Sequence, residues 1–182
     1  MPAMPHAARR PRKTKEDYLA LPDDVRAELI DGELYVTPAP EVAHQRAVAR
    51  LWRTLQDYAA ARDAGEAFVS PCDVHLPSGD VVQPDVLFVT HANAGIVREH
   101  VHGVPDLVVE VLSPSRPERD RFVKRALYER NRVPEYWVVD PEERSVEVLH
   151  LEGAAFVLAG WFTDDDVVVS PSLTAGITSS GR

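Results

Sequence analysis

The chain has 182 residues, 45% of them hydrophobic and 27% charged, which is the size and composition of one globular domain. It has a single cysteine, so no intramolecular disulfide can form. It has neither an apolar run of ~20 residues nor the apolar stretch of a secretory signal. We therefore expect a cytoplasmic protein without a membrane contact. The formal charge is -9, or -14 once the five basic residues that precede the first acidic one are set aside, which argues against a broadly basic nucleic-acid surface but not against a local phosphate-binding groove.

The residue patterns predict mixed helices and strands between two irregular termini. Residues 1–14 are basic and rich in Pro and Ala, which is typical of a disordered tail, and residues 176–182 are expected to form a flexible C-terminus. A single domain would therefore span residues 15–175. In chain order, its predicted elements are a helix at 15–21, a hairpin at 28–38, a helix at 41–65, strands at 67–74 and 84–89, a looser stretch at 91–105, a strand at 106–112, a helix at 119–131, and strands at 135–139 and 145–151.

Local signals support these elements. Asp31-Gly32 separates two apolar segments, and both central residues of a type I′ hairpin turn need positive φ, which this pair tolerates. Residues 106–112, DLVVEVL, are apolar on both faces, as in a strand buried in the middle of a sheet. Together with the following helix and strand, they predict a parallel crossover and an α/β fold with a mixed sheet. Tyr136 and Trp137 are expected in the core or in a subunit interface.

Two acidic residues stand out in apolar strands. Glu110 shares a strand face with two aliphatic residues, and a carboxylate buried there needs a salt bridge, a hydrogen-bond network or a metal ion. The partner in a salt bridge would be Lys124 or Arg125. Asp85 begins a second apolar strand after Pro84, a position where an isolated Asp is more often a strand-end cap.

The two acids together suggest a metal site, because like charges held close on neighbouring strands favour a bound divalent cation. Oxygen ligands fit Mg²⁺, and the sequence shows no Cys/His cluster of zinc type. Lys124 lies on the following helix, with Asp120 and Tyr128 one turn away on either side. Lys124 would either form a surface pair with Asp120 or direct its ammonium group toward the metal site, where it would stabilise charge on a phosphate.

Several motifs follow one another in a fixed order along the chain. They are ELIDGE at 28–33, Pro84-Asp85, EVLSPS at 110–115, Lys124, Tyr128 and EYWVVD at 135–140. This order resembles that of the Uma2 family of restriction-endonuclease-like proteins, and the resemblance covers about residues 14–171. It implies the PD-(D/E)XK nuclease fold, a central mixed β-sheet flanked by helices, here with an N-terminal β-hairpin.

The resemblance also implies roles for individual residues. Asp85 and Glu110 would hold the metal ion, with the backbone carbonyl of Val111 as a third oxygen ligand. Lys124 would be the catalytic lysine, with Tyr128 one turn further along the same helix. Glu28 would add an acid from the N-terminal region.

The sequence departs from the general nuclease pattern at two places, and three further residues are candidates for the site. Leu112 stands where the general nuclease pattern has a lysine, and residues 131–134 replace an expected glycine-containing turn. His44 lies on the apolar face of its helix, which favours a hydrogen-bonded core histidine, although the resemblance also places a histidine there. Tyr128 would either position substrate or pack at the helix edge, and Glu28 would otherwise be an exposed residue at a strand start.

The sequence therefore predicts a Mg²⁺-dependent, endonuclease-like phosphodiesterase that hydrolyses DNA, with Mn²⁺ as a substitute ion. A homodimer is expected because cutting both strands needs two sites. The rival hypothesis is a non-catalytic nucleic-acid-binding or protein-binding module that retains the nuclease fold, which the acidic charge and Leu112 favour. A third is a metal-dependent enzyme that acts on another phosphate ester, for which the same acids would serve.

Overall fold

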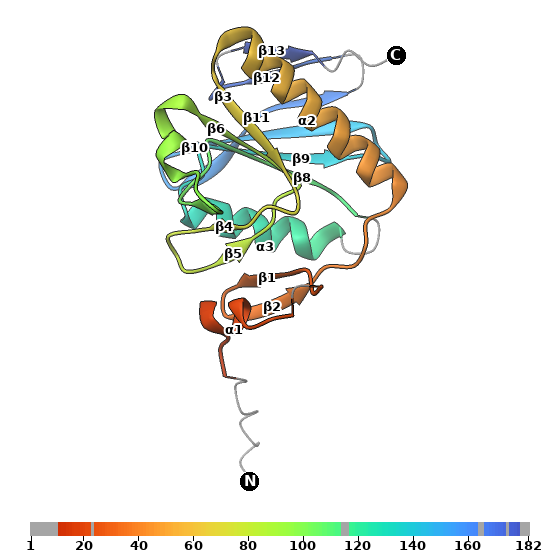
Figure 1. Ribbon diagram of the computed structural model, residues 1–182. Coiled ribbons are helices and arrows are strands. Elements are labelled where there is room, and N and C mark those ends of the chain that lie inside the picture. Colours follow the sequence, from red (N-terminus) through yellow and green to blue (C-terminus); the bar gives the residue numbers. More distant parts are fainter. Residues whose placement is uncertain (1–10, 23, 114–116, 164–165, 174, 179–182) are drawn as a thin grey trace, which may run out of the picture.

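The structure is a computed structural model that describes residues 11–22, 24–113, 117–163, 166–173 and 175–178 (Figure 1). Residues 1–10 of the expected tail and 179–182 of the expected C-terminus lie outside this part. The helices are α1 (Lys15–Leu19), α2 (Val42–Arg62), the 3-10 helix η1 (His91–Ile96) and α3 (Pro117–Arg130). None of the described helices combines the length and the apolar character needed to cross a membrane. The strands are β1 (Ala27–Ile30), β2 (Glu33–Val36), β3 (Gly65–Val69), β4 (Val74–His75), β5 (Val81–Val82), β6 (Val86–Thr90), β7 (Val101–His102), β8 (Leu107–Val111), β9 (Glu135–Asp140), β10 (Ser145–Glu152), β11 (Ala155–Thr163), β12 (Val167–Ser170) and β13 (Ala175–Thr178).

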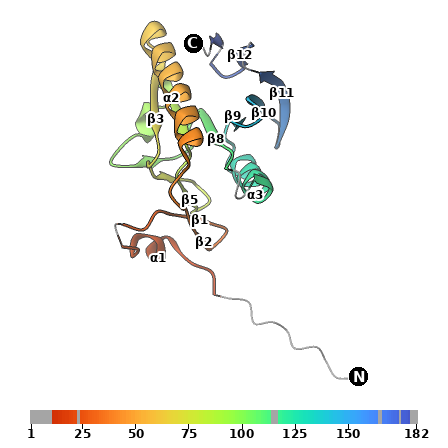
Figure 2. The same ribbon diagram turned by 90° about the vertical axis from the view of Figure 1, so that its right-hand side faces the viewer.

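The larger sheet is mixed and lies between two helices. Its six strands have the order β11-β10-β9-β8-β6-β3, in which β8 and β9 are parallel and the other neighbours are antiparallel. Helix α2 packs on one face and α3 on the other, as the two views show (Figure 2). Because α3 joins β8 to β9, the predicted parallel crossover and the predicted mixed α/β sheet are confirmed.

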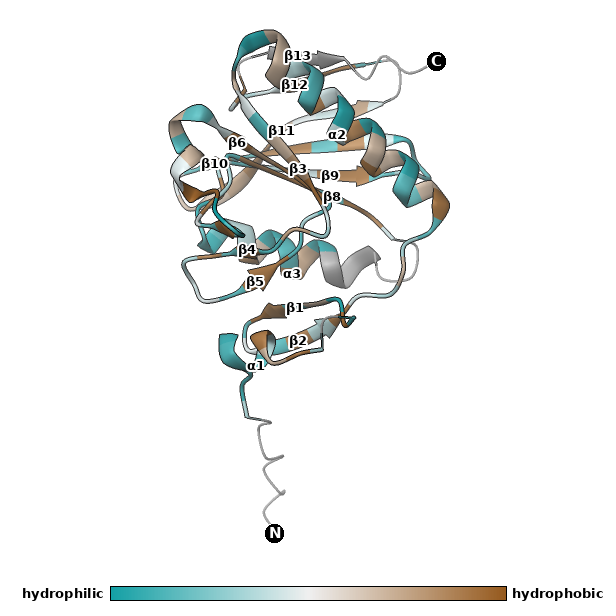
Figure 3. Cartoon of the chain, in the orientation of Figure 1, coloured by the Kyte–Doolittle hydropathy of each residue, from teal (hydrophilic) through white to brown (hydrophobic). Residues whose placement is uncertain are grey.

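Both faces of the central strands are buried. The core beneath α2 contains Val109 and Trp137, whereas the core beneath α3 contains their neighbours Val108 and Tyr136. Tyr136 and Trp137 are each 1% exposed, so the predicted core position of this pair is confirmed. Strands β6, β8 and β9 are accordingly hydrophobic along most of their length (Figure 3). This two-sided burial explains why the β8 sequence is apolar at every position except its glutamate.

The smaller sheet carries the N-terminal hairpin. Its five strands have the order β2-β1-β5-β4-β7, and β1 and β2 form the predicted hairpin. The turn residues Asp31 and Gly32 have φ of 54° and 76°, the two positive values that the predicted turn requires. The register of β1 against β5 consists of one pair, Leu29 with Val81. The hairpin thus extends the smaller sheet beyond β5, and α1 lies beside the hairpin (Figure 1).

The prediction of one strand at 67–74 is wrong. Strand β3 ends at Val69, and the chain passes through the cis Ser70-Pro71 peptide bond before β4 begins in the other sheet. Pro71 has no backbone N–H for a sheet ladder, so the apolar run is divided between the two sheets. The looser stretch at 91–105 contains η1 and β7, and strands of two residues such as β5 and β7 are too short to show a period.

The turn between α3 and β9 explains one departure from the expected pattern. Arg132 has φ of 64°, in the left-handed region that glycine adopts most easily. Its guanidinium donates to the carbonyl oxygen of Gly153 at 2.5 Å. The turn thus keeps the conformation of a glycine turn while a side chain connects it to the β10–β11 hairpin.

Candidate active site

A cleft lies where β6 and β8 meet the β1–β2 hairpin and helices α2 and α3. The antiparallel register pairs Val86 with Val109. Asp85, which directly precedes Val86, therefore stands opposite Glu110, which directly follows Val109. The acidic, basic and histidine side chains that line the cleft are Arg26, Glu28, His44, Asp85, Glu110, Arg121 and Lys124. Four of the five predicted site side chains therefore meet in one cavity, and the fifth, Tyr128, lies behind it.

Glu110 is bound by two donors from α3. Its Oε1 accepts hydrogen bonds from Lys124 Nζ at 3.0 Å and from Tyr128 Oη at 2.5 Å. Lys124 and Tyr128 are one helical turn apart, so both side chains reach the same carboxylate. Tyr128 is fully buried, and it contacts the cleft through Glu110.

The structure decides between the alternative partners predicted for Lys124. Its side chain is 8% exposed and contacts two glutamates, which excludes a solvated surface role. Arg125, the other predicted partner of Glu110, instead contacts Glu129 and the carbonyl oxygen of Phe156. The side chain of Asp120 lies outside the described part of the structure.

Glu28 reaches the cleft from β1. Its Oε1 accepts hydrogen bonds from Lys124 Nζ at 2.5 Å and from the backbone N–H of Gln83 at 2.8 Å. The Glu28 side chain is 12% exposed, so it is not the exposed strand-start residue of the alternative reading. Sequence patterns do not predict this role for Gln83, because a polar residue before a strand carries no distinctive signal.

Asp85 is fixed by donors from two elements. Its Oδ2 accepts a hydrogen bond from the backbone N–H of Val111 at 2.8 Å and lies 3.2 Å from His44 Nε2. The hydrogen bond to Asp85 raises the pKa of His44, although burial acts in the opposite direction. His44 is the hydrogen-bonded histidine that its helical position predicts, but its partner is an acid of the cleft.

Burial and neighbouring charges set the protonation of the Glu110–Lys124 pair. Burial raises the pKa of Glu110 to about 7, and the nearby carboxylates of Asp85 and Glu28 add to this rise while Lys124 opposes it. Burial alone would lower the pKa of Lys124, but the carboxylates of Glu110 and Glu28 raise it above its ordinary value. Lys124 is therefore an ammonium group at neutral pH, beside a carboxyl group that titrates near neutrality.

The oxygen atoms of the cleft are suitable ligands for a hard divalent cation. Within the described residues, the hydrogen bonds of Asp85 and Glu110 fall on Oδ2 and Oε1, and the second oxygen of each carboxylate receives none. Val111 lines the same cleft, and its backbone carbonyl is the third oxygen ligand that the family resemblance implies. Two carboxylates and a carbonyl are ligands that Mg²⁺ takes together with water. Glu28 has the same arrangement, because its two hydrogen bonds, from Lys124 and Gln83, both fall on Oε1.

A second group of metal-ligand type lies outside this cleft. Among the described residues, Asp73, His75 and His100 have ligand atoms that all lie within 4.8 Å of one another. None of the three lines the cleft of Asp85 and Glu110. The sequence shows no zinc-type spacing, but the fold brings together ligands that are 25 residues apart.

A mixed sheet with helices on both faces, and with acids on adjacent strands beside a helical lysine, defines the restriction-endonuclease-like class of fold. The family described as "Uma2: Putative restriction endonuclease" matches residues 15–180, so the chain belongs to the Uma2 family. Among solved structures, it is similar to "a putative nuclease belonging to DUF820" from Anabaena variabilis, with a TM-score of 0.74 and 17% sequence identity over 91% of this chain and 94% of that one. A search of curated proteins found no match.

Proposed function

We propose that the protein is a Mg²⁺-dependent, endonuclease-like phosphodiesterase that hydrolyses DNA, with Mn²⁺ as a substitute ion. The observation that carries this proposal is the buried Lys124 ammonium beside Glu110, in the same cleft as Asp85. Asp85, Glu110 and the Val111 carbonyl would hold the ion. A bound divalent ion would lower the pKa of a water molecule and neutralise phosphate charge.

The protein's own side chains supply the remaining chemistry. Lys124 keeps its proton at neutral pH, so it presents a fixed positive charge to a phosphate that becomes more negative in the transition state. Tyr128 and Glu28 hold the ends of this charge network, because they bind Glu110 and Lys124 respectively. We assign them as positioning residues.

A local concentration of cations supports phosphate binding despite the net charge of -9. Arg26 and Arg121 line the cleft together with Lys124. The cleft therefore combines acids that attract a divalent ion with three cations that attract a phosphodiester. DNA is proposed as the substrate because the family is described as one of restriction endonucleases.

Plasmid nicking tests the proposal. The wild type should relax supercoiled plasmid in the presence of Mg²⁺ or Mn²⁺, and Glu110→Ala and Lys124→Ala should each lower the rate by ~10²-fold or more. Lys13→Ala, which removes half of an exposed ion pair with Asp17, serves as the matched control and should retain the wild-type rate. Equal rates in the wild type, Glu110→Ala and Lys124→Ala would rule out this site.

The rival function is a non-catalytic binding module. Two observations favour it: Leu112 occupies the usual lysine position, and Lys124 is already engaged by two glutamates. Calorimetric titration with Mg²⁺ distinguishes the two proposals, because a module without catalysis needs no ion at Asp85 and Glu110. Metal binding with cleavage of a simple phosphodiester but not of DNA would instead identify another phosphate ester as the substrate.

We further propose that residues 15–175 form the folding unit of a cytoplasmic homodimer. Strand β11 is an edge of the larger sheet, and its Leu158 and Trp161 are 60% and 65% exposed. Large apolar side chains on a sheet edge favour association with a second copy. Light scattering should give twice the chain mass for the wild type and the mass of one chain for Trp161→Ser.

A further inference from the structure

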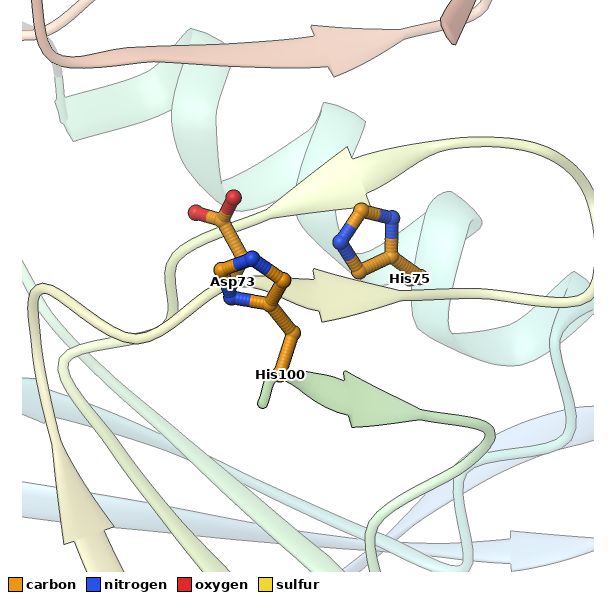
Figure 4. A group of neighbouring side chains, drawn as sticks. All are labelled: Asp73, His75 and His100. Carbon is orange, nitrogen blue, oxygen red and sulfur yellow. The ribbon is translucent and has the colours of Figure 1, made fainter. Parts of the chain in front are cut away.

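The cluster of Asp73, His75 and His100 lies on the smaller sheet. Asp73 directly precedes β4 and His75 is the last residue of β4, whereas His100 directly precedes β7, which is the parallel neighbour of β4. Their three ligand atoms lie within 4.8 Å of one another, and one ring nitrogen of His75 points toward the other two side chains (Figure 4).

His75 lacks the hydrogen bonds that a buried imidazole normally has. It is 8% exposed, and neither Nδ1 nor Nε2 has a hydrogen-bond partner among the described residues. Buried polar groups without a hydrogen-bond partner are rare in native proteins. In this cluster, the unsatisfied ring faces a carboxylate and a second imidazole.

Asp73 is oriented by two donors on the same oxygen. Tyr18 Oη and Gln83 Nε2 both donate to Oδ1, at 2.9 Å and 2.8 Å. Both hydrogen bonds fall on Oδ1, and Oδ2 receives none from the described residues. Hydrogen bonds of this kind orient metal-binding carboxylates in proteins.

The ring of His75 is held by its neighbours. His102 stacks on it with a centroid distance of 4.7 Å and an interplanar angle of 7°, and the ring of His100 lies 5.3 Å away.

We propose that Asp73, His75 and His100 form a binding site for a divalent transition-metal ion of the Zn²⁺ type, separate from the Asp85–Glu110 site. Two imidazoles and one carboxylate suit such an ion better than Mg²⁺, and three protein ligands leave a position for water. The ion would join β4 to the segment before β7. Gln83 connects this site to the cleft, because its side chain binds Asp73 while its backbone N–H binds Glu28.

Calorimetric titration of the full chain with Zn²⁺, without any polyhistidine tag, tests the proposal. The wild type should bind one ion that His100→Ala loses or binds at least tenfold more weakly. His100 is exposed, so its removal should leave the fold intact, and circular dichroism verifies this. His91→Ala, which removes an exposed histidine bound to Asp63, is the matched control and should bind Zn²⁺ like the wild type.

Three further measurements sharpen the result. Glu110→Ala should retain the Zn²⁺ affinity, which separates this site from the proposed nuclease site whether or not the protein cleaves DNA. Tyr18→Phe should weaken binding by about tenfold, because it removes one hydrogen bond that orients Asp73. Co²⁺ should give a visible absorption band that Asp73→Asn abolishes. Equal Zn²⁺ affinity in the wild type and His100→Ala, or loss of binding in Glu110→Ala alone, would overturn the proposal.

Discussion

Replacing Lys124 by Met tests whether the central charge network is held together as described. Methionine has a similar length and no charge, so it removes the ammonium with little change of shape. The variant leaves Glu110 and Glu28 facing each other, with side chains 15% and 12% exposed. We therefore expect lower stability, by an amount that depends on pH.

The size of the loss follows from the two contacts of the ammonium. At pH 6, Glu110 is mostly protonated because its pKa is about 7, and the variant loses mainly the charge-assisted hydrogen bond to Glu28, about 2 kcal/mol. Without Lys124, the pKa of Glu110 rises further. Above pH 7 the wild type releases this proton and the variant retains it, so the difference grows by about 1.4 kcal/mol per pH unit. At pH 8.5 the loss should be about 4 kcal/mol, as for a broken buried ion pair.

Urea denaturation of both proteins at pH 6.0 and pH 8.5 measures the two differences. Lys13→Met is the control, because its exposed pair with Asp17 should contribute less than about 1 kcal/mol at either pH. Adding Glu110→Gln to Lys124→Met should remove most of the pH dependence. A destabilisation that is equal at both pH values, or larger at pH 6.0, would refute the reasoning.

Three other substitutions probe polar groups buried around the core. Tyr128→Phe removes the hydroxyl that donates to Glu110, so stability should fall by about 2 kcal/mol in urea and the pKa of Glu110 should rise above 7 in an NMR titration. Although burial acts in the opposite direction, Arg130 holds the pKa of Asp80 below its ordinary value. Asp80→Asn should therefore cost about 1–3 kcal/mol at pH 7, and this difference should disappear in urea unfolding as the pH falls below about 4. Glu135→Gln places amide hydrogens against donors that now bind a fully buried carboxylate, so unfolding in urea should show a loss of about 1–3 kcal/mol, and an unchanged midpoint would contradict this role.

The site could be predicted where a charge interrupts an apolar pattern. Glu110 in a strand buried on both faces requires a partner, and the crossover helix that follows returns Lys124 to that strand only 14 residues later. The sequence does not identify the partner of His44, because a histidine on an apolar helix face fits a backbone carbonyl and Asp85 equally well. Local residue spacing does not show which side chains that are far apart in the sequence meet in the fold.

Length alone does not separate the predicted elements from the missed ones, because β11, with nine residues, was not predicted although the shorter β6 and β8 were. The central strands, the hairpin and the three α-helices have clear periods or turn signals, and the structure has them at the expected places. The smaller sheet could not be predicted, because β4, β5 and β7 have two residues each and are defined by tertiary pairing. For the same reason, the cluster of Asp73, His75 and His100 is visible only in the folded chain, because neither β4, which contains His75, nor β7, which His100 precedes, is long enough to show a period.

The separation of Glu28 and Lys124 by 96 residues has a consequence for the order of assembly. Glu110 and Lys124 can meet as soon as β8 and α3 form, whereas Glu28 arrives only when the hairpin docks. The hairpin is attached through one β1–β5 residue pair, a small apolar cluster around Leu29 and Val81, the packing of Ile30 in the core beneath α3, and polar contacts at Glu28 and Asp31. We expect it to be among the first elements to open in hydrogen exchange, so that local unfolding of β1 uncovers the lysine without unfolding the larger sheet.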